Sequence, residues 1–165
     1  RIMYYLSIVC ARKSILIANS YFVPDQRAIE ILVDAKRRGV DVRIMVAGIH
    51  NDSQIARDNS VRLYGKLLEA GVEIYEYDRT MLHQKYMVCD GAWSTVGTTS
   101  FDNRSLGLND ESNVCVYDRD FAAQFAKIFA DDLASCRRVT LEEWRGRGTM
   151  TKLREMIASL LRDQA

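Results

Sequence analysis

The chain of 165 residues is about one domain long, and its 48% hydrophobic and 27% charged residues are ordinary for a soluble globular protein. Its net charge is +1, so the chain does not have the excess of basic residues that is typical of nucleic-acid-binding proteins. The composition therefore argues against nucleic acid as a partner. The scattered cysteines form no Cys-x-x-Cys pair, and two histidines are too few to complete a zinc site. We therefore expect no metal, and reduced thiols in a cytosolic compartment at Cys10, Cys89, Cys115 and Cys136.

The N-terminal stretch Arg1–Arg12 has an apolar middle but no cleavage site after it, so we predict no signal peptide. No apolar run approaches the roughly 20 residues that span a membrane. The sequence starts at Arg1, without a methionine and directly in a helical pattern. We therefore expect a fragment of a longer protein.

In chain order, the first half alternates helical and strand-like segments. Residues 2–10 follow helical spacing, and the single proline, Pro24, precedes a helix that Asp25 can cap and Gly39 can end. Further helical spacing covers 55–70, and strand-like runs cover 14–19, 40–47 and 72–77. Strands that alternate with single helices predict βαβ units and a largely parallel sheet.

The pattern changes after residue 83. Lys85–Cys89 and Ser94–Val96 look like two strands joined at Asp90-Gly91, a pair that is typical of a hairpin turn. A polar, loop-like segment then covers 97–110, a strand covers 112–117 and a helix covers 121–136. We predict an α/β fold for residues 1–165 as a single domain, with a mixed, mostly parallel sheet flanked by helices on both faces.

The C-terminal segment from Thr151 has a one-sided apolar stripe at helical spacing, formed by Leu153, Met156, Ile157, Leu160 and Leu161. Because the opposite face is basic, such a helix can lie on an anionic membrane. The same stripe is what packing against a sheet requires, and we favour packing.

His83 and Lys85 are the most informative pair in the chain. Residues two apart on a strand point to the same face, so the imidazole and the ammonium group should reach into one site. A neutral histidine can attack phosphorus or carry a proton, and a lysine can hold phosphate oxygens. The small, polar stretch that starts at Gly97 can add backbone N–H groups and hydroxyls for the same oxygens.

Five residues match the pattern H-x-K-x(4)-D-x(6)-G-[SGT]-x-N: His83, Lys85, Asp90, Gly97 and Thr98. This pattern is the motif of the phospholipase D superfamily, which the chain therefore resembles. Position 100 departs from the motif, because Ser100 stands where the family usually has asparagine. The serine keeps a hydroxyl donor but is shorter and lacks the amide. Flanking blocks at 21–25, 38–40, 67–72, 81–83, 102–106 and 108–111 narrow the resemblance to bacterial cardiolipin synthases, over about the second half of such an enzyme.

This resemblance implies a two-step transfer at phosphorus without a metal or a cofactor. One histidine attacks the phosphodiester and forms a phosphohistidine, while another protonates the leaving alcohol and later deprotonates the acceptor. If the chain is the second half of a two-motif enzyme, His83 would be the acid/base group. If the chain pairs with an identical copy, one His83 could be the nucleophile and the other the acid/base group. The expected catalytic residues are His83, Lys85, Asp90 and Glu111, and the expected substrate-binding residues are Gly97, Thr98, Ser100 and Asn103.

Three residues keep a second interpretation. Glu111 resembles the carboxylate that accepts a hydrogen bond from a motif histidine and sets its tautomer, but by itself it reads as a surface glutamate at a strand start. Asp90 is expected to orient the turn or Lys85 rather than to touch substrate. His50, in a loop after a strand, has no partner at motif spacing, and we interpret it as a loop residue.

The resemblance implies a phosphatidyltransferase that moves a phosphatidyl group between two phosphatidylglycerol molecules and yields cardiolipin and glycerol. The implied partners are this phospholipid, a membrane surface, and a second motif-bearing half in the same chain or in a homodimer. The implied location is the cytoplasmic side of the cell membrane, through parts outside this chain, with the domain itself soluble. Two alternatives remain: a phospholipase D, phosphodiesterase or nuclease that uses water as the acceptor, and a half-domain that is inactive alone. The near-neutral charge argues mildly against a nuclease.

Overall fold

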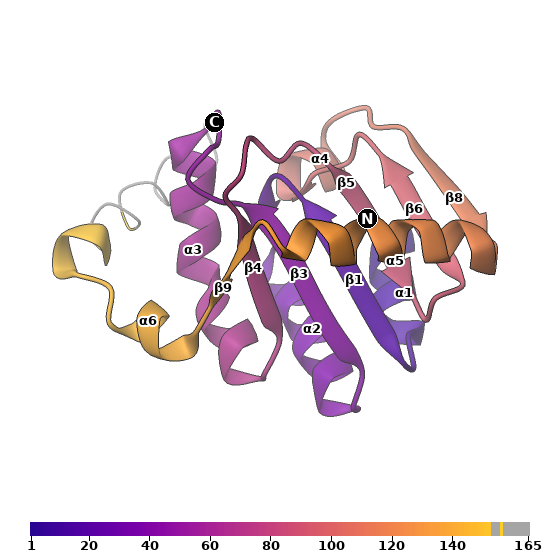
Figure 1. Ribbon diagram of the computed structural model, residues 1–165, viewed down its shortest axis with the longest axis horizontal. Coiled ribbons are helices and arrows are strands. Elements are labelled where there is room, and N and C mark those ends of the chain that lie inside the picture. The colour runs from indigo at the N-terminus through magenta and orange to yellow at the C-terminus, as the bar shows by residue number, and fades with distance from the viewer. Residues whose placement is uncertain (153–155, 157–165) are drawn as a thin grey trace.

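The computed structural model describes residues 1–152 and 156, and Figure 1 shows one central sheet with helices on both sides. The sheet has seven strands in the order β8-β6-β5-β1-β3-β4-β9. Its strands are β1 (Ser14–Asn19), β3 (Asp41–Ala47), β4 (Glu73–Tyr77), β5 (Lys85–Cys89), β6 (Trp93–Gly97), β8 (Asn113–Tyr117) and β9 (Cys136–Val139). Two short strands, β2 (Phe22–Val23) and β7 (Phe101–Asp102), pair with each other in parallel outside this sheet.

The strand directions combine a parallel centre with antiparallel flanks. β1 pairs in parallel with β3, and β3 with β4, whereas β5, β6, β8 and β9 join through antiparallel pairings. Consequently β1, β3, β4 and β6 point one way, and β5, β8 and β9 point the other. The predicted α/β class with a mixed sheet is confirmed, and the parallel part of the sheet, β1, β3 and β4, is built from the predicted βαβ units.

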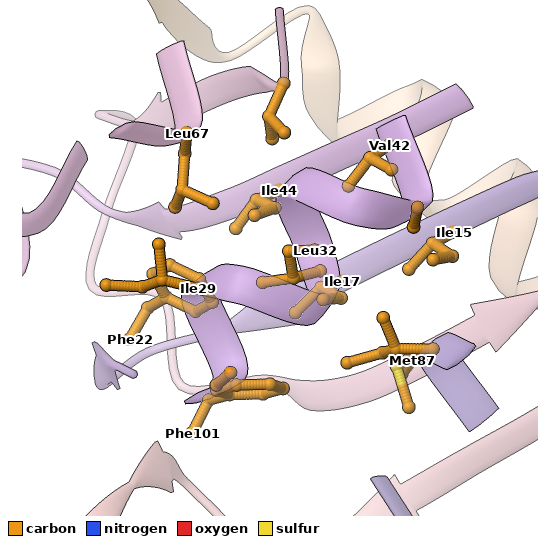
Figure 2. Close-up of a cluster of buried hydrophobic side chains, with 14 of the residues drawn as sticks. Ile15, Ile17, Phe22, Ile29, Leu32, Val42, Ile44, Leu67, Met87 and Phe101 are labelled. Carbon is orange, nitrogen blue, oxygen red and sulfur yellow. The ribbon is translucent and has the colours of Figure 1, made fainter. Parts of the chain in front are cut away.

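Helices cover both faces of the sheet, as predicted. On one face lie α1 (Ile2–Cys10), α2 (Gln26–Arg37) and α3 (Gln54–Glu69), and α5 (Arg119–Leu133) crosses the other face (Figure 1). Adjacent residues of β3 serve the two layers: Ile44 joins the cluster that includes Leu32 of α2 (Figure 2), and Met45 joins the cluster that includes Phe129 of α5. Full burial of such a side chain stabilises by about 1.5–3 kcal/mol, so both layers are held by the sheet between them.

The boundaries of several elements follow the local signals in the sequence. Asp25 caps α2 by accepting a hydrogen bond from a first-turn backbone N–H, and Gly39 follows the helix with φ +89°. Asp90 and Gly91, between β5 and β6, have φ values of 55° and 60°. Two successive residues with positive φ form the tight hairpin turn whose twist matches the flanking strands, which confirms the predicted hairpin.

The structure differs from the prediction after α5 and in the polar segment 97–110. The helix predicted over 121–136 ends at Leu133, and Cys136–Val139 form β9 against β4, followed by α6 (Leu141–Arg145). The segment predicted to be a loop contains β7 and α4 (Asn103–Gly107). β9 and β7 each pair with a strand far away in the sequence, so these predictions were wrong because the deciding contacts are not local.

The predicted N-terminal helix is confirmed as α1, yet its buried side chains are Tyr4 and Ile8. Ile2, Leu6 and Val9, which carry the helical spacing, are exposed. The apolar stripe of this helix therefore does not face the core of the described residues.

The remaining predictions concern the C-terminus, membrane spans and cysteines. The predicted C-terminal stripe lies outside the described residues except for Met156, which is exposed. Within the described residues, no helix is long and apolar enough to cross a membrane. The cysteines, predicted to be reduced, are free thiols.

Candidate active site

The carboxyl ends of β1, β3, β4 and β6 and the amino end of β5 lie at one edge of the sheet, at the top of Figure 1. The register produces this arrangement, because Asn19 at the end of β1 pairs with Lys85 at the start of β5. In open α/β sheets, ligands bind beyond the carboxyl ends of the strands. The loops after β1, β3 and β6 and the segment before β5 therefore surround one candidate site.

His83 and Lys85 lie side by side at this edge. The Nζ atom of Lys85 donates a hydrogen bond to Ser20 Oγ at 2.9 Å and lies 3.4 Å from His83 Nε2. This distance allows the ammonium group to donate to an unprotonated Nε2. Lys85 is buried whereas His83 is exposed, so the cation is held in place while the imidazole remains accessible to a ligand.

Opposing effects act on the pKa of Lys85. Burial lowers the pKa of Lys85 below its usual value, and the negative charges of Glu111, Asp52 and Asp102 act against that shift. Asp52 comes from the loop after β3, and Asp102 and Glu111 come from the segment between β6 and β8. Together they favour the charged form of Lys85 and oppose the effect of its burial.

Glu111 lies within electrostatic range of Lys85 but is bonded to Thr98. Thr98 Oγ1 donates a hydrogen bond to Glu111 Oε2 at 2.5 Å, and Thr98 Oγ1 in turn accepts one from Ser112 N at 3.0 Å. The hydrogen bond from Thr98 is the largest cause of a lowered pKa of Glu111. No hydrogen bond joins Glu111 to His83 within the described part of the chain, so this residue is held near the site by Thr98 rather than by the histidine.

Gly97 and the residues after it are shaped by β8. A Cβ on Gly97 would lie 2.1 Å from the carbonyl oxygen of Ser112, so the close pairing of β6 and β8 requires a glycine there. Thr99 Oγ1 donates to Asn113 Oδ1 at 2.6 Å, and Asn19 Nδ2 donates to Thr99 O at 3.2 Å. The backbone of this loop is therefore fixed by the neighbouring strands before any ligand arrives.

A cleft of about 620 Å³ opens at the same edge, a volume typical of ligand sites. Ser100 and Asn103, both predicted to bind substrate, line it together with Glu111 and Tyr21. His83 and Lys85 do not line this cleft themselves, but Tyr21, which does, also contacts both of them. Ser100 is buried at the position where the family motif has asparagine.

Tyr21 and Asp52 lie at the site but are not among the catalytic or substrate-binding residues expected from the sequence. The hydroxyl of Tyr21 donates to Asp52 Oδ2 at 2.5 Å, which connects the loops after β1 and β3. The ring of Tyr21 lies edge-on to the His83 imidazole, with centroids 6.2 Å apart, and Lys85 Nζ lies 5.3 Å from the Tyr21 centroid. Their position in loops at strand ends was a signal for both residues, and Tyr21 also belongs to a block that resembles the family.

Asp90 lies at the opposite end of β5 from Lys85. Its carboxylate accepts hydrogen bonds from the backbone N–H groups of Arg12, Lys13 and Ser14 at 2.7–3.1 Å. Asp90 therefore lies away from His83 and Lys85, and its hydrogen bonds anchor the hairpin turn at the start of β1. His50 is exposed in the loop after β3, consistent with its interpretation as a loop residue.

The chemistry available at this edge is that of a phosphoryl-transfer site. A fixed ammonium group stabilises negative charge on phosphate oxygens, and an adjacent exposed imidazole can act on phosphorus or on an alcohol proton. Within residues 1–152 and 156, no group of three or more His, Cys, Asp or Glu side chains is arranged to hold a metal ion.

Two solved structures share this fold. A phospholipase D family member, Nuc, from Salmonella typhimurium has a TM-score of 0.76 at 22% identity, over 85% of this chain and 90% of that chain. A phosphatidylserine synthase from Haemophilus influenzae has a TM-score of 0.71 at 14% identity, over 97% of this chain and 41% of that chain. At these identities the similarity concerns the fold alone.

Sequence comparison reaches further. The chain is 37% identical over 158 residues to cardiolipin synthase 2 of Staphylococcus epidermidis and to the cardiolipin synthase of Clostridium perfringens. The aligned residues are 96% of this chain but only 32% and 33% of those proteins, so the chain spans about a third of their length. Residues 7–133 match the family described as cardiolipin synthase, PLD-like domain. The chain therefore belongs to the cardiolipin synthase PLD-like domain family of the phospholipase D superfamily.

Proposed function

We propose that this chain is a catalytic half of a cardiolipin synthase, which transfers a phosphatidyl group from one phosphatidylglycerol to another and releases glycerol. The juxtaposition of Lys85 Nζ and His83 Nε2 at 3.4 Å, in a chain of this family, carries the proposal. The relatives of the same family that are named cardiolipin synthase support the substrate class.

The reaction would proceed in two displacements at phosphorus. A nucleophilic histidine forms a bond to the donor phosphorus, the bond from phosphorus to the glycerol oxygen breaks, and the acid/base histidine gives that oxygen a proton. The acid/base histidine then takes a proton from a hydroxyl of the acceptor, whose oxygen attacks the phosphohistidine and frees the nucleophile. Lys85, held by Ser20, stabilises the negative charge on the phosphate oxygens in both steps.

Two histidines are required, and this chain contributes His83. We assign His83 to the acid/base role and place the nucleophile in a second half that carries its own motif, in the same polypeptide or in a second copy of this chain. Residues 1–165 then form one domain of the complete enzyme. Glu111 can accept a hydrogen bond from the histidine of that other half.

Phosphatidylglycerol is a membrane lipid, so the complete enzyme would work at a membrane surface. We propose that parts of the protein outside this chain hold it at the cytoplasmic side of the cell membrane. Exposed apolar side chains on loops at the site edge, Ile49 and Met81, would face the lipid.

The test is turnover of phosphatidylglycerol vesicles by the full-length protein. We expect cardiolipin and glycerol in equal amounts, and His83→Ala should lower kcat by about 10²–10⁴-fold because it removes a proton-transfer group. His50→Ala, which changes the other histidine at this edge, should keep its activity. A folded preparation of the full-length protein that makes no cardiolipin would contradict the proposal.

Hydrolysis is the competing reaction of the same centre, since His83 is exposed and water can reach it. The product distinguishes the two, because water as the acceptor yields phosphatidic acid instead of cardiolipin. Phosphatidic acid as the main product from vesicles rich in phosphatidylglycerol would favour the phospholipase D alternative.

A further inference from the structure

The cleft beside His83 and Lys85 combines an apolar surface with one cation. Val23, Ile55 and Leu108 supply the apolar surface, and Ile55 and Leu108 remain 40% and 81% exposed. Arg104 is the one lysine or arginine among the described residues that line the cleft. This combination suits a ligand with an apolar part and a negative charge.

The guanidinium group of Arg104 is available for a ligand. Within the described residues, no hydrogen bond or ion pair of the structure engages it, whereas Arg57 and Arg137 are both paired with Glu76. The backbone at this position is held, because the N–H groups of Leu108 and Asn109 donate to Arg104 O at 2.7 and 2.8 Å. A planar guanidinium group carried on a held backbone can bind a phosphate through two parallel hydrogen bonds.

Two carboxylates line the same cleft, and each already accepts a hydrogen bond from the protein. Asp102 Oδ1 accepts the Ser105 N–H at 2.9 Å, and Glu111 Oε2 accepts the Thr98 hydroxyl at 2.5 Å. Their remaining lone pairs can accept hydrogen bonds from ligand hydroxyls. A headgroup that has one phosphate and free hydroxyls, such as phosphoglycerol, matches a cleft with one cation and several acceptors.

The cleft is structurally tied to the reaction centre. Val23 in β2 pairs with Asp102 in β7, and this pairing joins the two walls of the cleft. Tyr21, adjacent to β2, lines the cleft and contacts both His83 and Lys85. A headgroup in the cleft therefore lies against Tyr21, one side chain away from the imidazole.

Building on the proposed function, we propose that this cleft binds the acceptor phosphatidylglycerol and that Arg104 holds the acceptor's phosphate. The donor phosphate reacts at His83 and Lys85, and a free hydroxyl of the acceptor headgroup faces that centre. In cardiolipin one glycerol separates two phosphates, so the product requires two anion subsites one headgroup apart. Water and neutral alcohols have no phosphate for Arg104 to bind, so the subsite favours a lipid acceptor over them.

The test measures two acceptors in one assay. Full-length enzyme receives phosphatidylglycerol vesicles and labelled free glycerol, and both cardiolipin and labelled phosphatidylglycerol are quantified. Transfer to free glycerol uses the donor subsite alone, whereas cardiolipin formation uses both subsites. For Arg104→Gln we expect the ratio of cardiolipin to labelled phosphatidylglycerol to fall about tenfold or more, since a charge-assisted hydrogen bond to phosphate is lost. Arg104→Lys should restore part of the ratio, because lysine keeps the charge without the planar fork.

Arg79→Gln is the matched control, since Arg79 is exposed at the same edge but does not line the cleft. Its ratio should equal that of the unmodified enzyme, and thermal unfolding should show that all variants are folded. If the unmodified enzyme makes cardiolipin and Arg104→Gln leaves the ratio unchanged, the acceptor subsite is wrong while the proposed function stands. An equal loss of both products would also overturn it, because Arg104 would then act on a step common to both acceptors. If the unmodified enzyme makes no cardiolipin at all, both proposals are wrong.

Discussion

Lys85 and Asp90 belong to the same sequence motif and the same strand, but they do different work. Lys85 begins β5 beside His83, and Asp90 follows its last residue at the opposite edge of the sheet. Five residues of extended chain span about 16 Å, which places the carboxylate beyond direct contact with a ligand at Lys85. The spacing of the motif therefore places Lys85 at the end of β5 that lies in the site and Asp90 at the other end, where it anchors the turn.

Asp90 should stabilise the fold in a pH-dependent manner. Burial opposes ionisation of Asp90, but the hydrogen bonds from the backbone of Lys13, Ser14 and Arg12 outweigh it and lower the pKa. A lowered pKa in the folded state means that the stabilisation is present above the unfolded value of about 3.9 and is lost as pH falls through the folded value. We expect Asp90→Asn to lower the free energy of unfolding by about 2 kcal/mol at pH 7, and by progressively less below about pH 4.

Urea unfolding between pH 3 and pH 8 measures this difference. Asparagine tolerates the positive φ of this position, so the substitution reports on the charge rather than on backbone strain. Asp34→Asn is the control, because Asp34 makes only an exposed ion pair with Arg37, worth about 0–1 kcal/mol. A loss of stability at Asp90 that does not depend on pH would contradict the explanation.

At the scale of elements, the edge strand β9 is attached through a buried carboxylate. Glu76 of β4 is 2% exposed, and it pairs with Arg57 of α3 at 3.3 Å and with Arg137 of β9 at 2.6 Å. One side chain thus connects a central strand, a helix and an edge strand. The short run Cys136–Val139 shows no alternating apolar pattern, because two of its four residues are arginines that face acidic partners on β4. This explains why a helix was predicted to continue there.

Removal of the Glu76 carboxylate should destabilise this corner strongly. We expect Glu76→Ala to lower the free energy of unfolding by about 3–5 kcal/mol, because two arginines lose their buried partner. Glu69→Ala removes an exposed ion pair with Arg145 and should change stability by about 0–1 kcal/mol. Chemical denaturation of both variants tests the difference, and equal effects would show that Glu76 is not the connection.

At the scale of the whole molecule, the site contains one motif histidine where the proposed reaction needs two. We expect the isolated chain to be inactive as a monomer and to gain activity only when two copies associate or when the other half of the enzyme is present. Light scattering combined with phosphatidylglycerol turnover over a range of protein concentrations measures this relation. If two copies form the site, activity per chain should rise with concentration together with the dimer fraction. Full turnover by a monodisperse monomer would contradict the two-histidine mechanism.

Much of the fold could be predicted because its signals are local. The helix over Gln26–Arg37 has a capping aspartate and a terminating glycine, and the hairpin has its two turn residues next to each other. The site could be predicted only in part. His83 and Lys85 are two residues apart, so their spacing alone predicted that they lie together, although His83 precedes β5. Ser20, Asp52 and Arg104, by contrast, reach the same edge from distant segments.

The sequence by itself determined the reactive pair, the βαβ centre of the sheet and the hairpin that presents Lys85. Each of these depends on periodicity or turn chemistry within a few residues. Only the tertiary structure decided that β9 closes one edge, that Asp90 lies away from the site, that Glu111 binds Thr98, and that Arg104 stands in a cleft next to His83. The reason is physical: strand order and loop-to-loop contacts depend on which distant segments pack together, and no short stretch of sequence specifies them.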